Sequence, residues 1–144
     1  MRRPPHFALL APFALVAAIA FVGCTTGAAI STEEPPVLVE PIAGTEIQRL
    51  TLSESAAERL NVQTATVELA GDGRVVPSAA VIIDTTGTYW VYTNPEPLVF
   101  VRQEIDPVHE EGLEAFFENG PESGTSVVTI GVPELYGAEF GIGK

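Results

Sequence analysis

The sequence holds few of the side chains that disulfide bonding, metal binding and covalent catalysis require. Its 144 residues include one cysteine, one methionine and two histidines. A single cysteine excludes an internal disulfide, and a tetrahedral zinc site usually needs several Cys or His ligands. No glycine-rich phosphate-binding loop follows a predicted strand. We therefore expect neither a metal nor a dissociable cofactor, and we do not expect an enzyme.

The polar side chains that remain do not form a convincing catalytic or calcium-binding set. Ser78 and Ser126 have no plausible general base other than His109, which falls in an acidic segment. We interpret His109 as a solvated loop residue. A cluster of glutamates lacks the ligand spacing of an EF-hand loop, so a solvated acidic face explains it better than calcium does: Glu110, Glu111, Glu114 and Glu118.

The lone cysteine follows an apolar leader. Arg2 and Arg3 precede a stretch over residues 7–22 that is apolar apart from one proline, which is the pattern of a secretory signal. The sequence FVGC at 21–24 resembles a bacterial lipobox, although its first position is more often Leu. This resemblance implies a covalent lipid on Cys24, which becomes the mature N-terminus. The alternative is an uncleaved transmembrane helix, and both place the rest of the chain outside the cytoplasm.

The charge and composition divide the remaining chain. We predict a signal peptide at 1–23, a flexible tether at 24–44 that is rich in proline and small residues, and one domain at 45–144. The mature part carries five Lys and Arg against nineteen acids, a net charge of −14. This charge argues against nucleic acid or anionic lipid as a direct partner and favours either solubility near a membrane or a basic protein partner.

The residue patterns of the domain predict short strands and one short helix. Alternation or β-rich composition indicates strands at 46–52, 62–69, 75–84, 88–93, 98–105 and 127–132, with a hairpin around Gly87. The helix spans about 53–60, with Ser53 as its N-cap. Asn61 can adopt the left-handed conformation that ends a helix, and Ser55 and Glu58 have the spacing of a capping box. Residues 106–120 leave two possibilities, a helix after Asp106-Pro107 or a turn at Gly112 followed by a strand.

Four stretches resemble the periplasmic adaptor (membrane fusion protein) family of tripartite efflux systems. In family order they are LTLSESAAERLNVQTATVEL (50–69), VVPSAAVIIDTTGTYWVY (75–92), FVRQEI (100–105) and NGPESGTSVVTIG (119–131). The resemblance implies an adaptor reduced to its membrane-proximal domain, because residues 70–74 stand where a full adaptor has further domains. The implied fold is a small, mainly β, antiparallel roll or barrel with one short helix, preceded by an N-terminal signal helix.

The same resemblance implies a role in transmembrane transport. It predicts an accessory protein, anchored to the extracytoplasmic face of a membrane, that docks on a transporter of the RND or ABC type. Metal handling is not expected, since the single methionine is Met1. We predict partner contacts either on the acidic surface or on one β-rich face: Trp90, Tyr92, Phe100 and Arg102. The alternative function is binding of a small molecule at Trp90 and Tyr136, which a pocket of sufficient size would favour.

Overall fold

A computed structural model describes residues 35–142 of the chain. The predictions of a signal peptide, of lipid on Cys24 and of a tether over 24–34 lie outside the described residues. Within 35–142, no helix has the length and apolar character needed to cross a bilayer.

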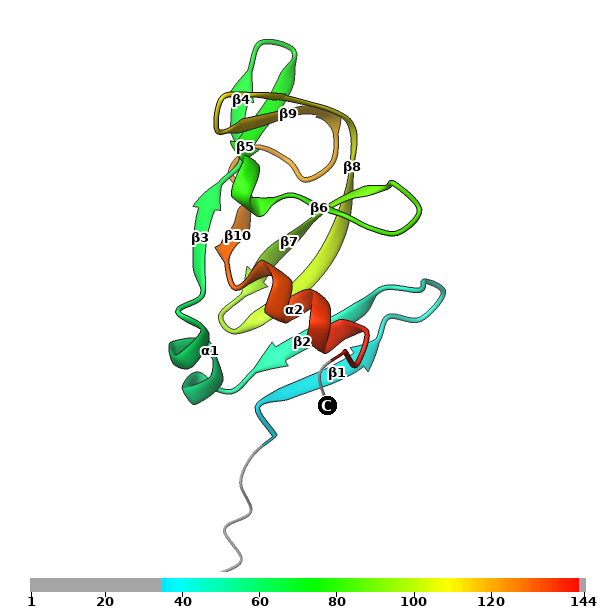
Figure 1. Ribbon diagram of the computed structural model, residues 1–144, viewed down its shortest axis with the longest axis vertical. Helices are drawn as coiled ribbons and strands as arrows, with labels where there is room; N and C mark the ends of the chain where they lie inside the picture. The colour runs from blue at the N-terminus through cyan, green and yellow to red at the C-terminus, as the bar shows by residue number, and fades with distance from the viewer. Residues whose placement is uncertain (1–34, 143–144) are drawn as a thin grey trace, which may run out of the picture. The chain divides into compact units, whose positions relative to one another are not determined.

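The described domain is mainly β and antiparallel, which confirms the predicted fold class (Figure 1). In chain order its elements are β1 (Val37–Pro41), β2 (Gln48–Leu52), α1 (Glu54–Leu60), β3 (Gln63–Thr66), β4 (Glu68–Ala70), β5 (Gly73–Pro77), the 3₁₀ turn η1 (Ser78–Ala80), β6 (Ile82–Ile83), β7 (Tyr89–Glu96), β8 (Val99–Glu111), β9 (Glu114–Asn119), β10 (Ser126–Ile130) and α2 (Val132–Glu139).

The sheet closes nearly into a barrel. Its strands follow the order β3-β10-β7-β8-β9-β5-β4, with β2 added to β8, β1 added to β2, and β6 added to β7. The first and last strands of this order, β3 and β4, are consecutive in the chain and are joined by Val67. The amide of Val67 donates to the carbonyl of Thr125 at 2.8 Å, and its own carbonyl accepts from Gly124 at 2.9 Å. Val67 alone therefore connects the two strands at which the barrel nearly closes, β3 and β4.

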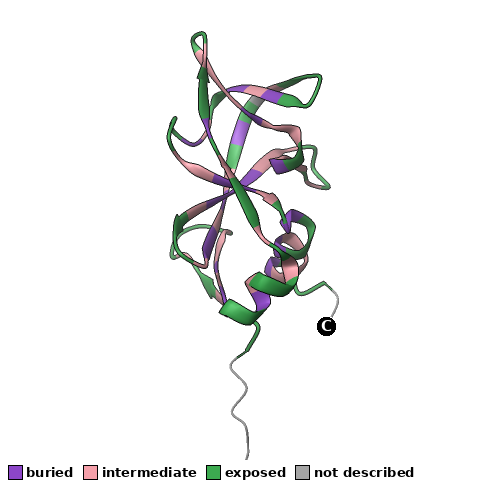
Figure 2. Cartoon of the chain, turned by 90° about the vertical axis from the view of Figure 1, so that its left-hand side faces the viewer, coloured by how far each residue is buried: buried purple, intermediate pink, exposed green. Residues whose placement is uncertain are grey.

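Neighbouring residues of the central strands point into two different cores. Val91 and Val127 lie in one buried cluster with Ile105 and Phe117, whereas the adjacent Tyr92 and Val128 lie in the other. The first cluster is inside the barrel; the second is covered by α1, α2 and the β1–β2 hairpin, so buried residues run through both halves of the domain (Figure 2). Because both faces are covered, these strands lose the simple alternation of apolar and polar residues.

Helix α1 follows its local capping signals. The Ser53 hydroxyl accepts from the amide of Ala56 at 3.2 Å, and Asn61 adopts the left-handed conformation with φ of 49°. Ala56 is the buried residue of the helix. The predicted helix and its two ends are confirmed, and Ser53 rather than Ser55 is the N-cap.

Several boundaries differ from the prediction. Residues 37–41, assigned to the tether, form β1 paired with β2, because Val37 and Val39 pack against the core beneath α2. The strand predicted over 62–69 is broken at Val67, where the chain passes from β3 to β4. Residues 106–120 form strand, turn and strand, with Gly112 at φ of 66° in the turn.

The C-terminal helix α2 was not predicted from the sequence. It begins after Gly131, which has φ of 94° and lies against Val62, and it places Pro133 in its first turn. Val132 and Leu135 anchor it in the core. These two contacts, and not its propensity, explain why a segment with a mid-helix glycine is helical.

Candidate functional site

The residues predicted as a partner-binding face are largely buried. Trp90 and Tyr92 lie on β7, and Phe100 and Arg102 lie on the adjacent β8, in register with Tyr92 opposite Arg102. Tyr92 is 0 % exposed, Phe100 3 % and Arg102 6 %, while Trp90 is half-buried. Helix α2 covers this face of the sheet, so Tyr92, Phe100 and Arg102 are not exposed for a partner in the described domain, and partner contact at these residues stays a prediction.

A buried polar cluster joins this face to α2. Glu139 of α2 is 3 % exposed, accepts a hydrogen bond from the Tyr92 hydroxyl, and lies 3.3 Å from the Nε of Arg102 through its Oε1. The side-chain Nε2 of Gln48 in β2 donates to the backbone carbonyl of Glu139 at 3.0 Å. Burial, and then the hydrogen bond to Glu139, raises the pKa of Tyr92 well above its usual range. The cluster ties β2, β7 and β8 to the C-terminal helix.

Aromatic rings enclose the guanidinium of Arg102. Its central carbon lies 4.0 Å from the centre of the Trp90 ring and 5.0 Å from that of the Phe140 ring. The Nε of Arg102 and the Oε1 of Glu139 are an ion pair that is not aligned as a hydrogen bond, and neither atom has another hydrogen-bond partner within residues 35–142. The stacking and the ion pair together compensate the buried charge.

A pocket of about 530 Å³ opens beside this cluster. Trp90, Arg102, Tyr136 and Phe140 line it, together with the β1–β2 and β6–β7 loops. Two aromatic residues that the alternative function named, Trp90 and Tyr136, are thus brought to one site, and its volume is in the range of small-molecule pockets.

The β6–β7 loop fixes one wall of this pocket. The Asp84 carboxylate accepts from the hydroxyl of Thr86 at 2.6 Å, from the amides of Thr86 and Thr88, and from the indole of Trp90 at 2.9 Å. These donors, with the Thr86 hydroxyl first, hold the pKa of Asp84 well below its usual range. The loop therefore orients the Trp90 ring.

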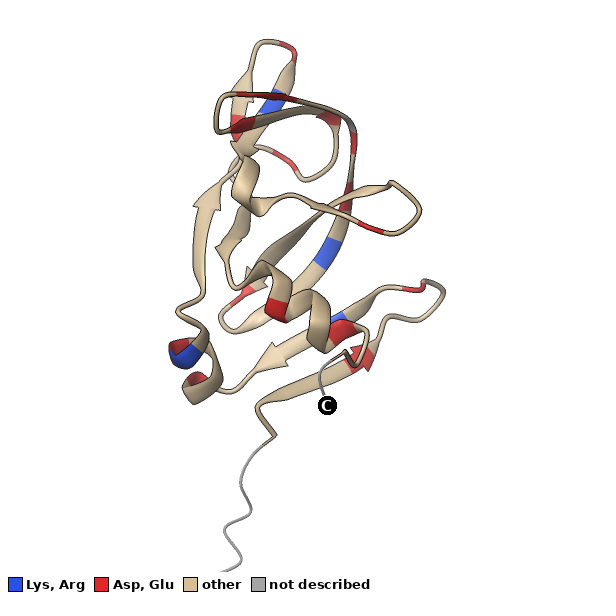
Figure 3. Cartoon of the chain, in the orientation of Figure 1, with Lys and Arg blue, Asp and Glu red and all other residues tan. Residues whose placement is uncertain are grey.

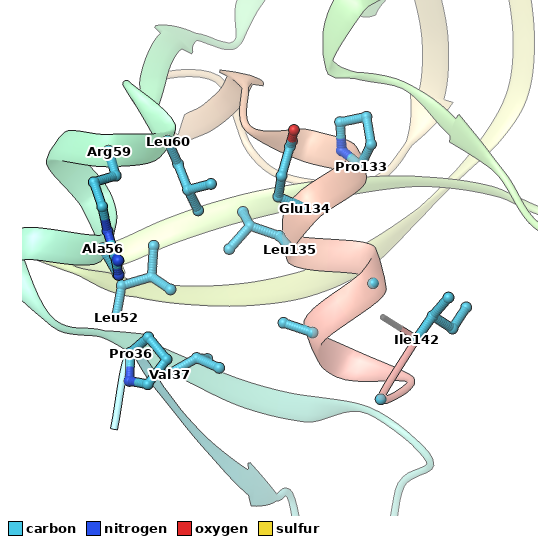
Figure 4. A pocket seen from close by; sticks show the side chains of 13 residues that line it. Pro36, Val37, Leu52, Ala56, Arg59, Leu60, Pro133, Glu134, Leu135 and Ile142 are labelled. Atoms are coloured by element: carbon cyan, nitrogen blue, oxygen red, sulfur yellow. The ribbon is translucent and has the colours of Figure 1, made fainter. Parts of the chain in front are cut away.

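An apolar groove lies between α1, α2 and β1 (Figure 4). Its volume is about 660 Å³. Leu52, Leu60 and Leu135 point into it, with Arg59 and Glu134 among its polar lining residues. Pro36, at the start of the described chain, and Ile142, at its end, also line the groove. Sequence reasoning missed this groove because one of its walls is the unpredicted α2.

Acidic residues occur in both halves of the described domain and outnumber the basic ones (Figure 3). Three of the four arginines in residues 35–142 lie near carboxylates: Arg49 with Glu96, Arg74 with Glu122, and Arg102 with Glu139. The fourth, Arg59, donates to the backbone carbonyl of Ser55 at the edge of the groove.

Within residues 35–142, the residues considered for catalysis or metal binding do not form a common site. His109 lies on β8 rather than in a loop, and it stacks on Phe116 of β9 with ring centres 5.0 Å apart. Over residues 35–142, no hydrogen bond links His109 to Ser78 or Ser126, and no three side chains of His, Cys, Asp or Glu are placed to hold a metal. A scan of family models, a search of curated proteins and a search of solved structures each gave no match to the chain.

Proposed function

We propose that this protein is an extracytoplasmic accessory subunit, anchored through Cys24, that docks on a membrane exporter through the apolar groove between α1 and α2. The observation that carries the proposal is the position of the groove at the start of the described chain, where Pro36 forms part of its lining.

Chain length limits how far the groove lies from the anchor. Cys24 precedes Pro36 by twelve residues. A fully extended chain spans about 3.6 Å per residue, so this segment reaches at most about 43 Å. With a lipid on Cys24, the groove stays within that distance of the bilayer, where the extracytoplasmic segments of a transporter are found.

The chemistry of the groove favours an apolar protein segment as its occupant. Leu52, Leu60 and Leu135 provide an apolar floor, and Ile142 is 66 % exposed at its edge. Exposed apolar residues around a groove are typical of an interaction site for an amphipathic helix. The excess of acidic over basic residues in the described chain favours a transporter segment with basic residues outside its apolar anchors.

The resemblance to the membrane-proximal domain of efflux adaptors supports the same role. The loop at residues 71–72 joins β4 to β5 as a tight hairpin, so the two resembling stretches 50–69 and 75–92 pair directly. In a full adaptor, long extensions that reach an outer-membrane channel stand in place of this short hairpin. Without them, docking on the transporter is the part of the adaptor role that this domain can keep.

Affinity capture of the full-length tagged protein from mild-detergent membranes tests the proposal. We expect one exporter to copurify, and we expect Ile142→Glu to reduce its recovery because a carboxylate is placed at the edge of the apolar groove. The matched control is Leu113→Glu, which alters an 85 % exposed residue between β8 and β9. Recovery of the exporter should also fall with Cys24→Ala. Equal recovery with Ile142→Glu and Leu113→Glu would overturn the assignment of the groove.

A further inference from the structure

We propose that the pocket lined by Trp90, Tyr136 and Phe140 binds a small organic cation. This is a second binding site, distinct in lining from the apolar groove, and the proposal does not depend on docking to an exporter. The volume of about 530 Å³ is large enough for a small ligand.

The charges around the pocket select for a positive ligand. Glu46 and Glu104 line it as exposed carboxylates, and Asp84 adds a third negative charge in the loop wall. Arg102 is the basic residue among the lining side chains, and its charge is matched by Glu139. An anionic ligand would meet three carboxylates.

The aromatic rings supply the second part of the recognition. Phe140 is 47 % exposed and lies 4.7 Å from the ring of Tyr136, so both rings border the pocket. Aromatic faces attract cations through the quadrupole of the ring. The domain already shows this chemistry, because the guanidinium of Arg102 lies between Trp90 and Phe140. Acidic and aromatic groups on one pocket form a site for an ammonium or guanidinium with an apolar body.

The side chains that line the pocket are held in fixed positions by contacts within the domain. Arg102 is 6 % exposed and lines the pocket, and its Nε lies 3.3 Å from the Oε1 of Glu139, so the ion pair fixes its position. The Trp90 indole donates to Asp84, and three hydrogen bonds from Thr86 and Thr88 hold that carboxylate in the loop. Preorganised walls of this kind reduce the entropy that a ligand loses on binding.

Fluorescence titration of the full-length protein tests the site directly. Trp90 is the single tryptophan of the chain, so its emission reports on this pocket. The probes are benzyltrimethylammonium, the neutral benzyl alcohol and the anionic benzenesulfonate. We expect a saturable change with the cation and none with the other two. A response to benzyl alcohol equal to that of the cation, or no saturable response to the cation, would overturn the proposal.

Two charge variants separate a local contact from the net charge. Glu104→Gln removes a lining carboxylate, and Glu110→Gln removes an exposed carboxylate farther along the same strand. We expect Glu104→Gln to weaken binding about two- to five-fold, as for one exposed ionic contact, and Glu110→Gln to leave it unchanged. Equal weakening by both variants would show non-specific attraction to an acidic protein and would contradict a defined site.

Discussion

The Nε of Arg102 in β8 and the Oε1 of Glu139 in α2 lie 3.3 Å apart in the interior of the domain. Arg102 is thereby held between two aromatic rings, and Glu139 also accepts from Tyr92. This pair adds to the apolar anchors of the C-terminal helix and lies at the boundary between the core and the aromatic pocket.

Loss of the Glu139 charge should destabilise the whole domain. Glu139→Gln leaves the Arg102 guanidinium buried without its counter-charge, and we expect a loss of about 3–5 kcal/mol in the free energy of unfolding. Glu134→Gln on the exposed side of α2 is the matched control and should change stability by less than about 0.5 kcal/mol. Urea denaturation followed by Trp90 fluorescence measures both. Similar midpoints for the two variants would show that the buried pair contributes little.

Stability should fall in alkaline solution because of Tyr92. Its pKa is raised in the folded state, so the folded protein keeps a proton that the unfolded chain releases above its ordinary pKa of about 10. The contribution is fully present below pH 10 and is lost as the pH rises above it. Denaturation midpoints between pH 8 and pH 11 test this. Tyr92→Phe should have a smaller decline over the same range, and an equal decline in both proteins would assign it to other groups.

The two serines at the start of α1 should differ in their effects. Ser53→Ala removes the acceptor for the amide of Ala56 and should cost about 1 kcal/mol of stability. Ser55→Ala removes only an exposed hydroxyl contact to Ser53 and should cost less than Ser53→Ala, because the higher helix propensity of alanine offsets that loss. Chemical denaturation of both variants measures the difference. A larger loss of stability for Ser55→Ala than for Ser53→Ala would show that Ser55 and Glu58 form the cap instead.

Two glycines with positive φ should tolerate alanine differently. A Cβ at Gly120 would lie 2.7 Å from the Cγ2 of Ile105 and 2.8 Å from the ring of Phe117, whereas a Cβ at Gly124 meets no heavy atom within 4 Å. Gly124→Ala carries only the backbone strain of its φ, so Gly120→Ala should be about 1–3 kcal/mol more destabilising. Thermal or chemical unfolding of the two variants measures the difference, and equal losses would show that the barrel end can repack.

Local signals explain what the sequence predicted well. Ser53 and Asn61 define α1 because capping acts within a few residues. The turn at Gly112 was one of two possibilities for residues 106–120, and the structure selects it. The mainly β class likewise follows from short β-rich runs separated by turns.

Contacts between distant segments explain what the sequence missed. Helix α2 depends on burial of Val132 and Leu135 against the sheet, so its local composition resembles a loop. The buried cluster combines residues 92, 102 and 139, whose proximity only the folded topology sets. Because the sequence does not show that α2 packs over them, Tyr92 and Arg102 were expected on an exposed face. Trp90 and Tyr136 were named together as aromatics, and the shared pocket depends on where α2 ends.

Site-specific photocrosslinking tests the central claim most directly. A photoreactive residue is placed at Ile142 at the edge of the groove or, as control, at Leu113 in the β8–β9 turn, in the full-length protein in its own membrane. The proposal predicts a crosslink from position 142 to an extracytoplasmic segment of one exporter, absent from position 113 and lost with Cys24→Ala. An exporter crosslink of equal yield from both positions, or none from position 142 in the anchored protein, would contradict docking through the groove.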